Sequence, residues 1–127
     1  MVEEGHHEEL VKGIAAQLKP ILQKSEQAVY IYLDDNHKIC NNNFADLLGY
    51  KSAKEWADSD APLADVVERD QQSVIKAYEE ATEKFVASSV AVSVTNVKTG
   101  KIIKTKMILV PIVYNGHVFS MHFLSTI

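Results

Sequence analysis

The sequence predicts an α+β fold in which a five-stranded antiparallel sheet carries helices on one face and is preceded by an amphipathic helix. Three observations lead to this prediction. Apolar residues recur with a helical period in two segments, at about 8–24 and 70–85. From Val90 onward the period changes to 2, which is typical of a strand. Turn signals at 98–100 and 115–116 then join three consecutive strands into a meander.

The first element is an amphipathic helix at about 8–24. Pro20 lacks a backbone donor and should kink or divide it. No partner helix follows directly, so its apolar stripe must cover either the rest of the domain or a second copy of the helix. We therefore divide the chain into an N-terminal helix, residues 1–27, and a main domain, residues 28–127. The stripe consists of Leu10, Ile14, Leu18 and Leu22.

Two short strands and two short helices are predicted next. Aromatic and β-branched residues favour a strand at 28–33, and the Asp-Asp-Asn turn that follows leads into a second strand at 37–41. Asn42 and Asn43 are good caps for a helix at 44–48. The next helical turn has Ser52 as its N-cap, with Glu55 at the spacing of a capping box.

A longer helix and the meander complete the domain. The helix is predicted to begin at Asp70 and to end at Phe85, with apolar residues on one side and charged residues on the other. Strands are predicted at about 90–95, 101–113 and 117–125. Because consecutive hairpins make neighbouring strands antiparallel, these elements favour an α+β design.

At this point the sequence resembles the PAS family. The segment VYIYLDD at 29–35 is similar to the first strand of that family, and NNNFADLLGY at 41–50 is similar to its asparagine, short helix and Gly-Tyr pattern. Gly116 and the strand after it fit the closing hairpin. Counting back from the Gly-Tyr pair puts the family asparagine at Asn41, whereas counting forward from the first strand puts it nearer Asn43. Both alignments remain open.

The resemblance implies a sheet whose helices enclose a pocket, and the pocket of this family holds haem, flavin, a small metabolite or only side chains. It also implies pairing of two copies through the helix before the first strand, which makes Leu10, Ile14, Leu18 and Leu22 the candidate dimer contacts. Trp56, if it faces inward, needs a partner for its indole N–H, and a ligand can provide one. The candidate pocket residues are Ile31, Phe44, Leu48, Trp56, Ile75, Tyr78, Val92, Met107, Phe119 and Met121.

The cofactor remains unknown, but two cofactors are disfavoured. Haem needs an axial ligand, usually a histidine on the long helix, and residues 70–85 contain none. His117 is predicted at a turn, and His122 is predicted as a hydrogen-bonded histidine of the sheet. The flavin chemistry of LOV domains uses a cysteine in a helix after the Gly-Tyr pair, whereas Cys40, the only cysteine, precedes that pair.

Metal and catalytic sites are not predicted. His6 and His7 lie among glutamates, but a helix places only residues three or four apart on one face, so we expect a charged terminus rather than a metal site. The serines show no nucleophile motif, and Asp34 and Asp35 fit a turn better than an acid–base pair. We therefore expect a protein that is not an enzyme.

Composition disfavours two classes of partner. The net charge is −4, and only a lysine group at 98–106 is basic, which argues against nucleic acid. We interpret that group as a solvated sheet edge. No apolar run approaches the roughly 20 residues of a membrane span, and the first residues are acidic rather than apolar. We expect a cytoplasmic protein without a membrane partner.

The sequence therefore predicts a sensory module of the PAS type that binds a small ligand or a partner protein, forms a homodimer and passes its signal to a downstream protein. Two alternatives remain. One is a structural interaction module whose pocket is filled by its own side chains. The other is a small enzyme with a cone-like α+β fold.

Overall fold

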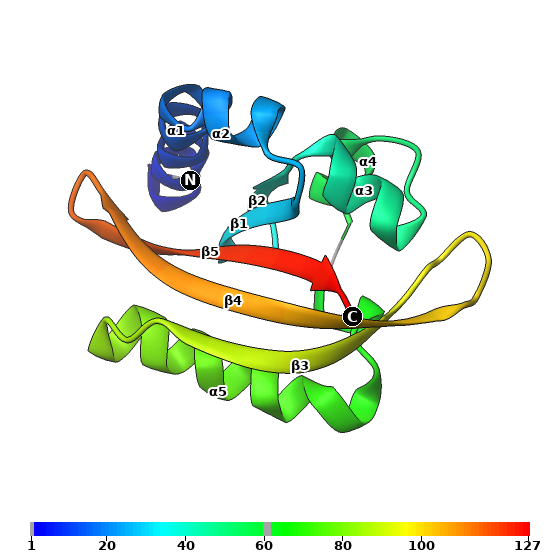
Figure 1. Ribbon diagram of the computed structural model, residues 1–127. Helices are drawn as coiled ribbons and strands as arrows, with labels where there is room; N and C mark the ends of the chain where they lie inside the picture. Colours follow the sequence, from blue (N-terminus) through cyan, green and yellow to red (C-terminus); the bar gives the residue numbers. More distant parts are fainter. Residues whose placement is uncertain (1, 60–61) are drawn as a thin grey trace.

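The computed structural model describes residues 2–59 and 62–127, with the side chains of 2–5 and 62 left out (Figure 1). The five strands are β1 (Ala28–Asp34), β2 (His37–Cys40), β3 (Ser88–Thr95), β4 (Ile102–Tyr114) and β5 (His117–Thr126). They form one antiparallel sheet in the order β2-β1-β5-β4-β3. The predicted α+β class, the five antiparallel strands and the closing meander are confirmed.

The helices lie on both faces of this sheet. The N-terminal pair is α1 (Val2–Gln17) and α2 (Lys19–Lys24), and the others are α3 (Asn42–Leu48), α4 (Ala53–Ala57), a 3₁₀ turn (Pro62–Asp65) and α5 (Glu68–Lys84). One apolar cluster packs α3, α4 and α5 against one face of the sheet, which we call the inner face. A second cluster packs α1 and α2 against the opposite face, which we call the outer face. Among the described residues, none of these helices is long and apolar enough to cross a membrane.

The N-terminal helix is divided as predicted, because α2 begins with Pro20 in its first turn and Leu18 interrupts the helical run. Leu10 and Ile14 are 2% and 3% exposed and pack against β1 and β5. Leu18 and Leu22 are half-buried against the same cluster. Of the two predicted uses of the apolar stripe, covering the domain is the one that the structure shows, with Leu10 and Ile14 buried and Leu18 and Leu22 still partly exposed.

One glycine of α1 faces the β4–β5 hairpin. A Cβ atom placed on Gly13 would lie 2.1 Å from the hydroxyl oxygen of Tyr114 on β4, which is far inside van der Waals contact. A side chain at position 13 would therefore require the ring of Tyr114 to move away from α1.

Local signals placed most boundaries within a few residues. Ser52 caps α4 by accepting a hydrogen bond from the backbone N–H of Glu55, as predicted. The long helix begins at Glu68, two residues before the predicted start, and ends at Lys84. Phe85 follows in a left-handed conformation, with a φ of 57° and 55% of its surface exposed. It is thus the residue that ends the helix rather than part of its apolar side.

Candidate functional site

A cavity of about 290 Å³ lies between α5, the 3₁₀ turn and the inner face of the sheet. Val74 and Ile75 contribute its wall from α5, and β1 and β5 contribute aromatic side chains. This volume is near the lower end of the range for small-molecule sites, which is roughly 300–1,000 Å³. Its lining consists of Tyr30, Tyr32, Asp35, Leu63, Val66, Val74, Ile75, Tyr78, Glu79 and His122.

Only part of the predicted pocket set lines this cavity. Ile75 and Tyr78 do so. Five others lie on the same side of the sheet but within the packed core, namely Phe44, Leu48, Trp56, Val92 and Met107.

Three predicted pocket residues lie on the opposite face of the sheet. Ile31, Phe119 and Met121 are buried under α1 and α2 rather than under α5. Side chains alternate along a strand, so Tyr30 and Tyr32 take the inner face when Ile31 takes the outer one. Both the odd-numbered and the even-numbered positions of the first strand carry apolar or aromatic residues, so no local signal distinguishes its two faces.

His122 is the most buried polar side chain of the cavity wall. It is 2% exposed, and its ring stacks on that of Tyr30 with centroids 3.9 Å apart and planes 5° from parallel. Burial lowers the pKa of His122 to about 3, so the ring is neutral at physiological pH. Its Nε2 lies 3.3 Å from the hydroxyl oxygen of Ser120, and its Nδ1 has no hydrogen-bond partner among the described residues. The neutral ring of His122 therefore forms a buried polar part of the cavity wall.

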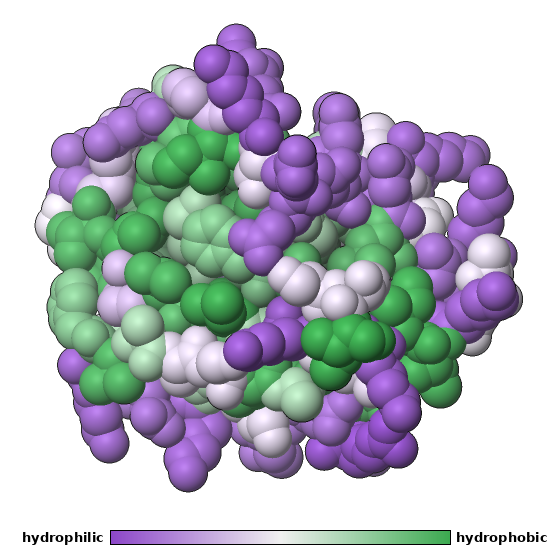
Figure 2. Space-filling model, viewed as in Figure 1, coloured by the Kyte–Doolittle hydropathy of each residue, from purple (hydrophilic) through white to green (hydrophobic). Residues whose placement is uncertain are grey.

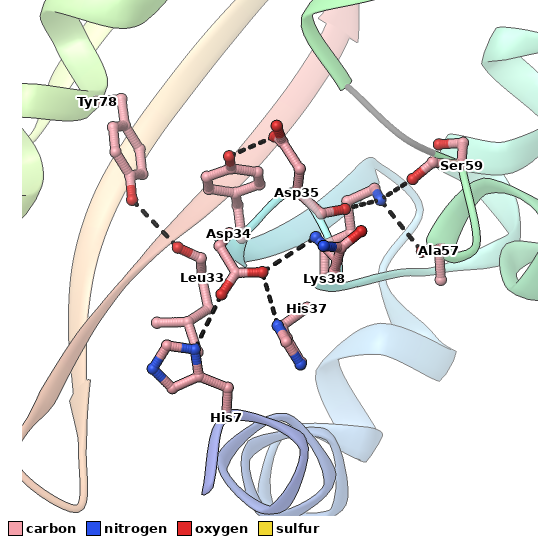
Figure 3. Close-up of polar contacts among 11 residues, drawn as sticks. His7, Leu33, Asp34, Asp35, His37, Lys38, Ala57, Ser59 and Tyr78 are labelled. Atoms are coloured by element: carbon pink, nitrogen blue, oxygen red, sulfur yellow. Dashed lines mark hydrogen bonds and ion pairs between the residues drawn. The ribbon is translucent and has the colours of Figure 1, made fainter. Parts of the chain in front are cut away.

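The phenol groups of the wall are fixed by neighbours. The Tyr32 hydroxyl donates to Asp35 Oδ1 at 2.6 Å, and the Tyr78 hydroxyl donates to the carbonyl oxygen of Leu33 at 3.4 Å (Figure 3). Burial raises the pKa of both phenols, so they stay protonated. Asp35 and Glu79 are the acidic groups of the lining, and no Lys or Arg belongs to its described residues. The charge of the wall thus favours a neutral or positively charged ligand over an anion.

A buried lysine holds the β1–β2 turn against α4. Lys38 is 2% exposed, and its ammonium group donates to the carbonyl oxygens of Asp35, Ala57 and Ser59 (Figure 3). The Nζ atom also lies 5.4 Å from the ring centroid of Trp56, which places a cation over an aromatic face. These contacts place the backbone of Asp35 at the edge of the cavity. The indole N–H of Trp56 is buried and has no partner among the residues described.

Comparison with known proteins identifies relatives only by structure. No family model matches the sequence, and no curated protein matches it. A PAS domain from a two-component sensor histidine kinase has 15% identity and a TM-score of 0.66, with 91% of this chain and 99% of that chain covered. A PAS domain from Colwellia psychrerythraea has 19% identity and a TM-score of 0.70, covering 90% and 97%.

A third similar structure is the LOV protein of Rhodobacter sphaeroides, with 9% identity, a TM-score of 0.72, and 91% of this chain and 68% of that chain covered. At these identities the likeness concerns the fold. It agrees with the element order on which the resemblance rested. The chain has the fold of PAS domains.

Proposed function

We propose that this chain is a non-catalytic sensory module that binds a small molecule in the cavity under α5 and signals through a partner protein. The observation that carries the proposal is the cavity itself, because its wall combines apolar side chains with a buried, neutral histidine. Apolar walls with a few placed polar groups are typical of small-molecule sites. The lining includes no Ser, Thr or Cys among the described residues, which supports binding rather than nucleophilic catalysis.

The chemistry of the wall suggests the class of ligand. A small, mainly apolar molecule fits the volume, and a single polar group on it can pair with His122. Carboxylates at Asp35 and Glu79 disfavour an anion, because no cationic side chain of the described lining compensates them. A neutral or cationic aromatic molecule is therefore the proposed class.

Two features of the site speak against haem and LOV-type flavin chemistry. The one histidine of the described lining, His122, is already stacked on Tyr30 at 3.9 Å. Cys40 is buried on β2 outside the cavity lining, and burial raises the pKa of its thiol to about 12. A thiol with so high a pKa is a poor nucleophile at neutral pH.

Filling the cavity is the direct test of this proposal. Replacement of Ile75 by Trp on the cavity wall is expected to weaken binding of indole and phenethylamine by about tenfold or more, because the new ring occupies the space. Lys76→Trp is the matched control, since Lys76 is exposed on the same helix. Titration calorimetry measures the affinities, and native mass spectrometry of freshly purified protein looks for a retained ligand.

Charge preference provides a second measurement in the same experiment. Benzoate, which has a similar size, is expected to bind more weakly than phenethylamine because of Asp35 and Glu79. If indole and phenethylamine bind Ile75→Trp as well as the original protein, binding occurs elsewhere. The module would then be the structural one whose cavity takes no ligand.

We also propose that two copies of the chain pair through the outer face of the sheet, next to α1 and α2. Leu10 and Ile14 of α1 are buried within the chain, but the neighbouring part of the same sheet face is only partly covered. Figure 2 shows apolar side chains gathered over β4 and β5 beside the N-terminal helices. We define the outer-sheet patch as Ile108, Val110, Ile112 and Phe123, of which Ile108 is 38% exposed and the others are half-buried.

The strand register joins this patch into one surface. Ile108 and Phe123 are direct cross-strand partners, so their side chains lie next to each other on one face. Contiguous apolar patches are uncommon on the surface of monomeric proteins, and where they occur they often mark interaction sites. A second copy provides a matching patch, which is the arrangement that twofold dimers use.

A charge placed in the patch tests the pairing. Ile108→Lys is expected to raise the dimer dissociation constant by about tenfold or more, because the lysine would have to be buried without a partner. Val113→Lys is the control, since Val113 is 56% exposed on β4 but lies outside the patch. Sedimentation equilibrium at several concentrations measures both variants. A dimer that tolerates Ile108→Lys as well as Val113→Lys would show that pairing uses another surface.

A further inference from the structure

A group of potential metal ligands lies at the junction of α1 with the β1–β2 turn. His7 comes from α1, Asp34 ends β1, and His37 begins β2. His7 Nδ1 lies 3.0 Å from Asp34 Oδ2, and His37 Nδ1 lies 2.6 Å from Asp34 Oδ1. The three ligand atoms all lie within 4.8 Å of one another. Figure 3 shows the carboxylate of Asp34 between the two imidazole rings.

These atoms and their spacing fit a transition-metal ion. Zinc binds imidazole nitrogen and carboxylate oxygen at about 2.0–2.2 Å in a tetrahedral arrangement, which places neighbouring ligand atoms about 3.3 Å apart. The distance from His7 to Asp34 is already close to that value, and the shorter contact of His37 needs only a small shift. Two imidazoles and one carboxylate also match the ligand set of several three-ligand zinc sites.

The carboxylate of Asp34 is held in place by its neighbours. The backbone N–H of Asn36 donates to its Oδ1 at 3.0 Å, and the same oxygen lies 2.6 Å from His37 Nδ1. His37 is 7% exposed, so the surrounding protein restricts the position of its ring.

Two further histidines stand beside this group. His6 Nε2 lies 3.0 Å from His117 Nε2, and the rings of His7 and His117 have centroids 6.3 Å apart. His117 begins β5. Three separate parts of the chain thus bring imidazoles to one place, and one of these extra rings or a water can complete the coordination.

We infer that His7, Asp34 and His37 form a site for a divalent transition-metal ion of the zinc class, which ties α1 to the β1–β2 turn. The sequence did not predict this site, because the glutamates beside His7 were considered as its co-ligands and the actual partners lie about 30 residues further along. The inference needs neither the cavity under α5 nor the outer-sheet patch. Either of those proposals can fail without affecting it.

Titration of the untagged, EDTA-treated full chain with ZnCl₂ and CoCl₂ tests the site. We expect one ion per chain and, for Co²⁺, the intense visible absorption of a tetrahedral complex. His7→Ala, Asp34→Ala and His37→Ala are each expected to weaken binding by about tenfold or more. Glu9→Ala is the matched control, because Glu9 is exposed on the same helix and makes no contact with the group. Thermal melts without metal establish whether each variant is folded. If His37→Ala does not fold, His37→Gln is used in its place.

Hydrogen exchange measures the coupling to α1. Zinc is expected to slow the exchange of α1 amides in the original protein and to leave it unchanged in the His37 variant, whose substitution lies outside α1. A role of His37 in packing alone would not make the exchange of α1 depend on zinc. The inference is overturned if the His7 and His37 variants bind Zn²⁺ as tightly as Glu9→Ala, or if zinc leaves α1 exchange unchanged in the original protein.

Discussion

Replacing Asn41 by Ala is expected to lower the free energy of unfolding by about 3 kcal/mol. The side chain of Asn41 is buried and connects three parts of the chain. Its Oδ1 accepts hydrogen bonds from the backbone N–H groups of Val29, at 3.0 Å, and Phe44, at 2.9 Å. Its Nδ2 donates to the carbonyl oxygen of Gln27 at 2.9 Å. Truncation would leave buried polar groups without partners and would remove the N-cap of α3.

Asn43 provides the matched control for this prediction. It is exposed, and its Nδ2 donates to the carbonyl oxygen of Ser25. Asn43→Ala is expected to change the free energy of unfolding by less than about 1 kcal/mol. Urea denaturation followed by circular dichroism measures both values. Equal losses for the two variants would show that the buried contacts of Asn41 do not determine stability.

The same pair of variants also decides between the two family alignments. The N-cap role and the contacts to β1 fall on Asn41, which is the position obtained by counting back from Gly49 and Tyr50. Counting forward placed the family asparagine nearer Asn43, whose side chain contacts the segment before β1. The geometry therefore favours the alignment at Asn41, and the larger loss is expected there.

Acid is expected to destabilise the fold through His122. Because the folded pKa of about 3 lies below the value of about 6.5 in the unfolded chain, the unfolded state takes up this proton first as the pH falls. The stabilising contribution of the neutral ring is complete above pH 6.5 and is lost as the pH falls toward the folded pKa. Between pH 6.5 and pH 4.5 the loss attributable to His122 is expected to reach about 2 kcal/mol.

A variant without the titrating ring isolates this effect. His122→Phe keeps an aromatic ring on Tyr30 and lines the same cavity, but it cannot be protonated. Its free energy of unfolding is expected to fall less than that of the original protein over the same pH range. The two proteins differ only at position 122, so the difference between their two curves is due to this side chain. Parallel pH dependences would show that His122 does not stay buried and neutral.

Local patterns were sufficient for the elements of the fold. The helical period, the change to a period of 2 and the Asn115-Gly116 turn predicted the order of helices and strands that the structure contains. The cap at Ser52 and the break near Pro20 followed from short-range chemistry. These signals act over a few residues and do not depend on what the element packs against.

The candidate site depended on long-range contacts and was predicted only in part. Ile75 and Tyr78 line the cavity because α5 is amphipathic, so its sequence shows which side faces the sheet. Tyr30 and His122 were missed because β1 and β5 are buried on both faces, and alternation then carries no information about which face meets the helices.

The sequence by itself determined the class of the fold, the order of its elements and most of their ends, because these follow from periodicity, caps and turns within each segment. The tertiary structure alone decided which face of β1 meets α5, where the apolar stripe of α1 is buried, and that His7 meets Asp34 and His37. Those outcomes result from contacts between residues far apart in the chain. Their energies depend on the packed arrangement and not on any local pattern.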